Sequence, residues 1–140
     1  MRSKIYLAGG FPTDGRADWR QKIYDSVGYA MGLVDWFDPY YNYCTDVAIL
    51  KENKNYWGWD TLKIKQSDIV FAYFEKENPG IGSFIELGLA YGLGKHIIVV
   101  VEKGNGDEVI LDKYRDDCNW FSDASFEKLE DGIEYLKTLL

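Results

Sequence analysis

The sequence predicts an α/β protein of one domain, in which a parallel sheet is covered by helices on both faces. Short apolar runs of strand length alternate with longer segments whose apolar side chains recur at helical spacing, as is typical of parallel sheets. Two runs, SDIVFAYF and HIIVVV, are apolar almost throughout, which indicates strands buried on both faces. The 140 residues are enough for one core and contain no linker or repeat, so residues 1–140 are predicted to form a single domain.

The first half of the chain contains two predicted strands and one predicted helix. Residues 4–10, KIYLAGG, form an apolar run that stops at a glycine pair, which predicts a buried strand followed by a tight loop. Residues 17–31 carry apolar side chains at helical spacing, and Gly32 is expected to end this helix. The run LVDWFDPY predicts a second strand, while residues 40–56 show no period and are expected to be irregular.

The second half of the chain predicts three more strands and three helices. In chain order they are a helix at 57–67, the strand SDIVFAYF, a helix at 82–93, the strand HIIVVV, a loop from 102 to about 116, a fifth strand at 118–122 and an amphipathic helix at 125–140. Ligands of such sheets bind beyond the carboxyl ends of the strands. The loops that follow Leu7, Phe37, Phe74 and Val101 are therefore where a functional site is expected.

The composition argues against several classes of function. A formal net charge of -7 argues against a surface that follows a phosphate backbone, so no nucleic acid partner is expected. The N-terminus enters a strand directly and no apolar run reaches membrane-spanning length, which predicts a cytoplasmic protein without a membrane partner. Cys44, Cys118 and His96 are too few and too dispersed for a disulfide framework or a metal site. The aromatic fraction of 16% suggests surfaces on which a flat ligand stacks.

A single acid, Glu86, stands in an otherwise apolar helical segment after the glycine-rich stretch NPGIG. In a capping box, Ser83 caps the helix and the Glu86 side chain reaches back to a backbone N–H group. Alternatively, the carboxylate lies at the mouth of the sheet, where the helix N-terminus favours its ionised form and it serves as a nucleophile or an electrostatic anchor. A phosphate cradle is disfavoured because the loop lacks the lysine of a phosphate-binding loop and the acid repels an anion, so a neutral ligand fits better.

Three segments together resemble the nucleoside 2-deoxyribosyltransferase family: IYLAGGFPTD, WGWDTLKIKQSDIVFAYF and GIGSFIELGLAYGLGKHIIVV. The resemblance covers nearly the whole chain, and its most specific part is the pattern from Gly82 to Lys95. It implies a flavodoxin-like doubly wound parallel sheet, in agreement with the elements above. It also implies an enzyme of nucleoside salvage that needs no cofactor and exchanges the base of a deoxynucleoside for another free nucleobase through a covalent deoxyribosyl-enzyme intermediate.

The resemblance implies roles for three side chains. Glu86 matches the nucleophile that attacks the anomeric carbon, Asp60 matches the acid that exchanges a proton with the base, and Tyr6 matches the tyrosine that orients the nucleophile. Cleavage of a glycosidic bond with retention requires two such carboxyl groups, and Asp60, among aromatic residues, is the one expected to be protonated. Without the resemblance, Asp60 is better interpreted as an exposed acid near a helix start, and Tyr6 as a core residue.

Substrate contacts are expected from glycine, aromatic and polar positions around these side chains. Phe11, Trp57 and Trp59 are candidates for stacking a base, with packing as the alternative. Asn119 aligns with a C-terminal asparagine that reaches a neighbouring subunit's site, so the resemblance implies a homo-oligomer built from dimers, up to a hexamer; by itself Asn119 is typical of a turn. The predicted substrate-binding residues are Gly9, Phe11, Trp57, Gly80, Gly82, Ser83 and Asn119.

One position departs from the family pattern. Where many of these transferases have an aspartate six residues before the nucleophile, this chain has Gly80, and Asn78 or Glu77 is the expected replacement. The serine with which related nucleotide hydrolases meet a 5′-phosphate is also missing, so nucleosides are the expected substrates. Three functions stay open: transfer of 2-deoxyribose, hydrolysis of deoxynucleosides or their 5′-monophosphates, and binding of nucleosides without catalysis. The intact catalytic set favours an enzyme.

Overall fold

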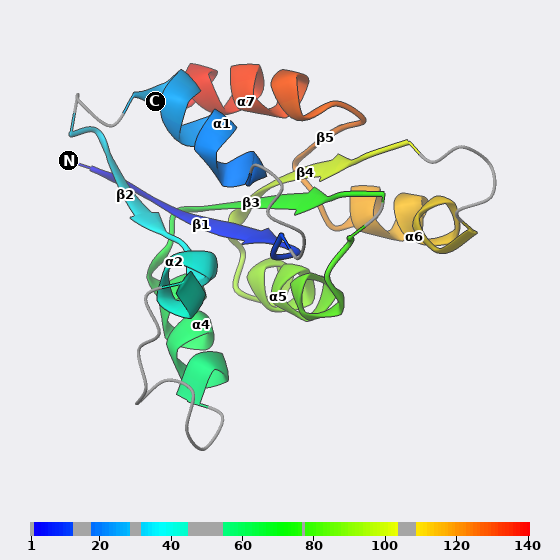
Figure 1. The fold of residues 1–140 in the computed structure, drawn as a ribbon, viewed down its shortest axis with the longest axis horizontal. Helices are drawn as coiled ribbons and strands as arrows, with labels where there is room; N and C mark the ends of the chain where they lie inside the picture. The colour runs from blue at the N-terminus through cyan, green and yellow to red at the C-terminus, as the bar shows by residue number, and fades with distance from the viewer. Residues whose placement is uncertain (1, 13–17, 29–31, 45–54, 77, 104–108) are drawn as a thin grey trace.

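The computed structural model describes residues 2–140 except 13–17, 29–31, 45–54, 77 and 104–108. Its centre is a five-stranded parallel sheet in the order β2-β1-β3-β4-β5 (Figure 1). The strands are β1 (Ser3–Gly9), β2 (Val34–Phe37), β3 (Ile69–Phe74), β4 (His96–Val101) and β5 (Ala124–Phe126). The helices are α1 (Trp19–Val27), α2 (Pro39–Cys44), α4 (Asn55–Gln66), α5 (Ile81–Gly92), α6 (Val109–Trp120) and α7 (Leu129–Thr138).

This strand order is that of the flavodoxin-like doubly wound fold, so the predicted fold class is confirmed. Helices α1 and α7 cover one face of the sheet, and α4, α5 and α6 cover the other (Figure 1). Alternate residues of β1 feed the two cores: Ile5 and Leu7 pack beneath α1 and α7, whereas Tyr6 and Ala8 pack beneath α4 and α5. All four are fully buried, as a continuously apolar strand in a doubly covered sheet requires.

Two boundaries in the first half of the chain differ from the prediction. Helix α1 ends before Gly28, whose φ of 83° breaks the helix and whose N–H group bonds to the Tyr24 carbonyl, so Gly32 is not the stop. The region 40–56, expected to be irregular, contains most of α2 and the start of α4. Residues 45–54 of that region lie outside the described residues.

The predicted position of the fifth strand is wrong. Residues 118–122 form the end of α6 and the turn after it, and the segment expected to be a loop is already helical from Val109. Strand β5 instead consists of Ala124–Phe126, and its last two residues were expected to start the final helix. The letters CNWFS suggest a strand, but Cys118 and Phe121 lie three residues apart and both pack against the core beneath α5, which is helical periodicity.

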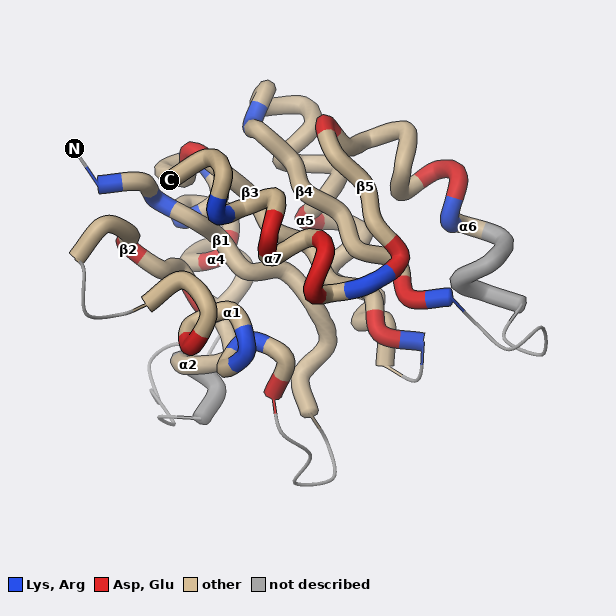
Figure 2. Tube along the Cα trace, turned by 90° about the horizontal axis from the view of Figure 1, so that it is seen from above, with Lys and Arg blue, Asp and Glu red and all other residues tan. Residues whose placement is uncertain are grey.

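The charged side chains are dispersed over the molecule. Figure 2 shows Lys and Arg near the start of β1 and on α1 and α6, with Asp and Glu between them. Such a mixed surface differs from the continuous basic stripe that follows a nucleic acid backbone. Among the described helices, none has the length and apolar composition needed to cross a membrane.

Candidate active site

A cavity of about 310 Å³ opens beyond the carboxyl end of β1. Crossovers on either side of β1 lead to β2 and β3, and ligands of doubly wound sheets bind at such a switch point. All predicted site residues except Tyr6 and Asn119 line the cavity. Gly10, Pro39 and Tyr56 line it as well and were not predicted. The glycine pair in the sequence could have indicated Gly10, whereas the positions of Pro39 and Tyr56 depend on how α2 and α4 pack against the sheet. The full lining is Gly9, Gly10, Phe11, Pro39, Tyr56, Trp57, Asp60, Gly80, Gly82, Ser83 and Glu86.

Glu86 is held against the sheet. Only 8% of its surface is exposed, and its carboxylate accepts a hydrogen bond from the Tyr6 hydroxyl, which lies fully buried in β1 behind the cavity wall. Helix α5 begins at Ile81, and Gly80 caps it without a side-chain hydrogen bond. The capping-box interpretation is therefore wrong, because Ser83 lies inside the helix and the Glu86 side chain bonds to β1 instead of reaching back to the helix start.

The protonation of Glu86 is governed by its burial. Loss of solvent raises the pKa of Glu86 to about 8; the hydrogen bond from Tyr6 opposes this shift, the charge of Asp60 adds to it, and the charge of Arg20 opposes it. Burial thus acts against the ionised form that the position near the helix N-terminus was expected to favour.

Asp60 is the second carboxyl group of the cavity. It comes from α4, and its Oδ1 atom is buried without a hydrogen-bond partner. Burial raises the pKa of Asp60 to about 7, which favours the protonated form expected from its aromatic surroundings. Tyr56, one helical turn earlier, also has a buried hydroxyl group without a partner. Buried unpaired polar atoms are destabilising and call for a functional explanation.

Gly80 and Gly10 touch at the edge of the cavity. Gly80 has a φ of 70°, and a Cβ atom there would lie 2.9 Å from the Cα and N atoms of Gly10. Backbone conformation and space therefore both exclude a side chain. Asn78, one suggested replacement for the family's aspartate, is engaged elsewhere, because its Nδ2 atom donates to the Phe11 carbonyl at 2.5 Å. Glu77, the other suggestion, lies outside the described residues.

The aromatic side chains near the cavity have different surroundings. Phe11 packs against Tyr40 with ring centroids 5.2 Å apart, and Trp57 is 46% exposed. A Cβ atom at Gly82 would lie 3.2 Å from the Trp57 ring, so the glycine lets the indole approach the start of α5. Trp59 packs against the core beneath α4 and is not part of the cavity lining. The packing alternative therefore holds for Trp59.

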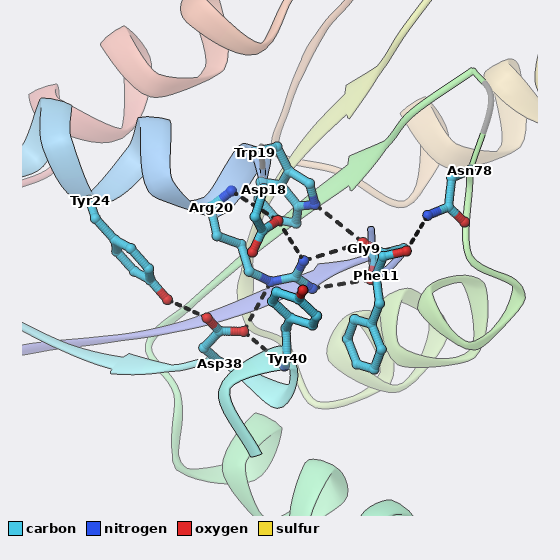
Figure 3. A network of polar contacts seen from close by, with 10 residues as sticks. Gly9, Phe11, Asp18, Trp19, Arg20, Tyr24, Asp38, Tyr40 and Asn78 are labelled. Carbon is cyan, nitrogen blue, oxygen red and sulfur yellow. Dashed lines mark hydrogen bonds and ion pairs between the residues drawn. The ribbon is translucent and has the colours of Figure 1, made fainter. Parts of the chain in front are cut away.

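No sequence pattern singles out Arg20, which forms a network of polar contacts beside the cavity. Its side chain is fully buried and donates to the carbonyl oxygens of Gly9 at 3.1 Å and Gly10 at 3.2 Å. It also forms ion pairs with Asp18 at 3.2 Å and Asp38 at 3.0 Å (Figure 3). Its partners come from three separate segments, the loop of Gly9 and Gly10, Asp18 before α1 and Asp38 after β2, so only the folded chain reveals the network.

Asn119 lies at the opposite edge of the sheet from the cavity. It belongs to the last turn of α6, and the following turn is fixed to the start of β4, where the Asp123 amide donates to the Ile97 carbonyl at 2.8 Å. A contact of Asn119 with substrate therefore requires a neighbouring subunit and stays a prediction. His96, also at the start of β4, has a structural partner in the Tyr135 hydroxyl at 3.1 Å.

The polar groups that line the cavity are carboxyl groups, hydroxyl groups and backbone amides. In the parts of the chain that the structure describes, no three His, Cys, Asp or Glu side chains form a group that could hold a metal ion. Such a donor set fits a neutral ligand with hydroxyl groups and a flat ring, because hydroxyls and ring nitrogens pair with these groups while the aromatic side chains cover the ring.

Known proteins share this architecture. A family model described as nucleoside 2-deoxyribosyltransferase like matches residues 2–104, and no curated protein matches the sequence. A conserved protein from Enterococcus faecalis V583 is similar in structure, with a TM-score of 0.72 at 21% identity over 100% of both chains. The 2-deoxyribosyltransferase from Bacillus psychrosaccharolyticus has a TM-score of 0.64 at 22% identity, over 95% of this chain and 92% of its own. A CMP N-glycosidase from Clostridium botulinum has a TM-score of 0.53 at 19% identity, over 96% of this chain and 98% of its own. At these identities the likeness shows a common fold.

Proposed function

Because this chain belongs to the nucleoside 2-deoxyribosyltransferase-like family, we propose that it transfers 2-deoxyribose between nucleobases by a retaining double displacement. One observation carries the proposal: Glu86, buried and hydrogen-bonded by Tyr6, shares a cavity with a second carboxyl group, Asp60. Two carboxyl groups in different environments can hold different protonation states. Cleavage of a glycosidic bond with retention requires this combination of a nucleophile and an acid.

The two carboxyl groups divide the reaction between them. In the first half, ionised Glu86 attacks C1′ and forms an ester, the electrons of the N-glycosidic bond leave with the base, and Asp60 gives its proton to the base nitrogen. In the second half, Asp60 takes the N–H proton of an incoming base, whose nitrogen attacks C1′ and releases the Glu86 carboxylate. Two inversions at C1′ give retention. Tyr6 keeps the carboxylate oriented in both halves.

The remaining lining residues are proposed to bind the nucleoside. Phe11 and Trp57 offer aromatic surfaces to the base. Gly9, Gly80 and Gly82 let the sugar approach the backbone closely, and Ser83 supplies a hydroxyl group. The cavity of about 310 Å³ falls at the lower end of the usual range for small-molecule sites.

The direct test is to incubate the protein with thymidine and free adenine and to follow the products by chromatography. Transfer yields deoxyadenosine and thymine in equal amounts. Hydrolysis, the alternative suggested by the likeness to a CMP N-glycosidase, yields thymine and free deoxyribose without a new nucleoside. A protein that only binds nucleosides yields neither product. If no deoxyadenosine forms with this or other pairs of deoxynucleoside and base, the transfer proposal is wrong.

We expect deoxynucleosides to be preferred over their 5′-monophosphates by a factor of at least about ten in kcat/KM. The described lining contains two acids and no Lys, Arg or His, while a 5′-phosphate carries nearly two negative charges at neutral pH. One unmet charged contact costs at least about 1.4 kcal/mol, a factor of about ten. Steady-state kinetics with deoxycytidine and deoxycytidine 5′-monophosphate measure the ratio. If kcat/KM is equal for the two substrates, or higher for the monophosphate, the prediction is wrong and the protein is better classed with the nucleotide hydrolases.

We also propose that the protein is a homo-oligomer formed through the outer surfaces of α5 and α6. The single charged residue of α5, Glu86, is buried, so its outer surface is uncharged. Large apolar side chains on the two helices are exposed instead: Ile81 by 81%, Ile85 by 61%, Tyr91 by 47% and Trp120 by 68%. Such clusters mark protein interfaces. Asn119 precedes Trp120 in α6 and is partly exposed, which is compatible with its predicted role in a neighbouring site.

Ile85→Glu should convert the oligomer into monomers at micromolar concentration, because it places a charge in the apolar interface. Sedimentation velocity measures the change. Leu33→Glu, at an apolar residue that is 47% exposed and precedes β2, is the matched control and should stay oligomeric. A wild-type protein that sediments as a monomer with full activity contradicts both the interface and the role of Asn119.

A further inference from the structure

Arg20 is buried among oxygen atoms, and Nε is its one guanidinium nitrogen with an ion-pair contact but no hydrogen bond among the described residues. Each of its three guanidinium nitrogens meets an oxygen atom, from the Gly9 or Gly10 carbonyl, Asp18 or Asp38 (Figure 3). The guanidinium carbon also lies 4.4 Å from the Trp19 ring centroid, within cation–π range. Taking a guanidinium fully out of water is costly even when it is well paired. A buried arginine of this kind is therefore weak evidence of stability and stronger evidence of a specific task.

The carbonyl groups that Arg20 holds belong to the loop that lines the cavity. On the other side of this loop, the Asn78 side chain donates to the Phe11 carbonyl (Figure 3). The loop is thus fixed from both sides, by α1 and by the segment before α5. Because Phe11 faces the cavity, the position of its ring depends on both clamps.

Arg20 also contributes charge to the cavity. The titratable and charged groups that influence Glu86 are Tyr6 from β1, Asp60 from α4 and Arg20 from α1, and Tyr56 shares the cavity lining. Arg20 is the cation of this set. Its charge favours the anion of Glu86, against the burial and the Asp60 charge that favour the protonated acid.

We propose that Arg20 is a positioning residue for the transfer reaction, on which this inference rests: it fixes the loop of Gly9 and Gly10, which lines the cavity with Glu86, and it holds a buried positive charge directly behind that loop. It acts through these residues and does not contact the substrate. The two effects are separable, because a lysine keeps the charge but loses the forked geometry, whereas a methionine loses both.

The charge effect is tested without substrate, by following the Glu86 side-chain carboxyl carbon by NMR as a function of pH. Arg20→Met should raise the midpoint of the Glu86 titration by at least about half a pH unit, and Arg20→Lys should leave it near the wild-type value. An unchanged midpoint in Arg20→Met, or an equal rise in both variants, overturns the inference. An inactive wild-type protein overturns the transfer function alone, because the titration needs no activity.

A second variant covers the case in which Arg20→Met does not fold. Asp38→Asn removes the negative charge 3.0 Å from Nε of Arg20, keeps one oxygen to accept from the Tyr40 amide and places an NH₂ group that can donate to the Tyr24 hydroxyl. Because less negative charge then offsets the Arg20 guanidinium, the midpoint of the Glu86 titration should fall to lower pH. An unchanged or higher midpoint overturns the charge effect.

The loop effect is tested by the kinetics of Arg20→Lys. Because a lysine cannot hold both carbonyl groups in the same way, the Phe11 ring should shift and KM for the nucleoside should rise several-fold. The acid side of the pH profile should stay at the wild-type position, since the charge is kept. An unchanged KM overturns the loop effect, and a shifted acid side overturns the separation of the two effects.

Discussion

Glu86→Gln should lower the rate of base exchange by at least about a thousandfold while the protein stays folded. The amide preserves the size of the side chain and can still accept the Tyr6 hydrogen bond, but it cannot form the ester at C1′. Initial rates measured by chromatography give the loss. Mass spectrometry of the intact protein, quenched during turnover, should detect a deoxyribosyl adduct in the wild type and none in the variant.

The same substitution should stabilise the protein at alkaline pH. Since burial raises the pKa of Glu86 to about 8 in the folded protein, the folded state keeps a proton that the unfolded chain releases above about pH 4.5. Stability is therefore lost as pH rises from about 4.5 to about 8, and a glutamine removes this loss. Denaturant unfolding should show the variant more stable than wild type by at least about 1 kcal/mol at about pH 8.5, with a much smaller difference at about pH 4.5.

Glu102→Gln is the matched control for Glu86→Gln. Glu102 follows strand β4 and, like Glu86, accepts a hydrogen bond from a tyrosine, Tyr73 at 2.7 Å, but it does not line the cavity. The control should retain base exchange. If Glu86→Gln keeps its activity, Glu86 is not the nucleophile; if both variants lose activity equally, the loss does not report on the site.

Asp60→Asn should lower kcat/KM for ordinary deoxynucleosides by about 10² to 10⁴, because the base then leaves without a proton. In the wild type, the carboxyl groups titrate as a pair, with pKa values of about 7 for Asp60 and about 8 for Glu86. The doubly protonated pair has no nucleophile and the fully ionised pair has no acid. Of the two singly protonated forms, the reactive one has Glu86 ionised and Asp60 protonated, and it is the less populated because Asp60 has the lower pKa. The wild-type kcat/KM should therefore rise towards about pH 7 and fall above about pH 8.

The pH profile distinguishes loss of the acid from general damage to the site. In Asp60→Asn the alkaline fall should disappear, and the remaining rise should follow the ionisation of Glu86 alone, so it should lie no lower in pH than the wild-type rise. A substrate whose base leaves without protonation, 7-methyl-2′-deoxyguanosine, should lose far less rate. Asp35→Asn, at a surface ion pair with Arg2, should behave as wild type. An equal loss for both substrates contradicts the role of Asp60 as the acid.

The fold could be predicted where one periodicity dominates. Strands β1, β3 and β4 are largely apolar because they are buried on both faces. Such continuous apolar runs are too short for a typical buried helix, so they predict strands. The segment CNWFS has apolar residues that satisfy either a strand or a helix end. Only its contacts with α5 decide for the helix, and such contacts are not encoded in local spacing.

The candidate site was predictable to a similar extent. Glu86 stands out as the one acid of an apolar helix, and the family resemblance assigns Asp60 and Tyr6. The direction of the Glu86 pKa was not predictable, because it depends on how much solvent the folded chain excludes. Arg20 was missed for a related reason: an arginine in an ordinary amphipathic helix is expected at the surface, and its partners are assembled only by the fold.

The contact between Gly80 and Gly10 also limits how this protein can evolve. Glycine and aspartate codons can differ by one base, so the aspartate that many related transferases carry here is genetically close. The present structure does not accommodate an aspartate here, because its Cβ atom would meet the Gly10 backbone at 2.9 Å and its φ would be 70°. The loop after β1 would have to move first, and Arg20 and Asn78 hold that loop in place. Acquisition of an aspartate at this position therefore depends on earlier changes elsewhere, which makes Gly80 a site of strong epistasis.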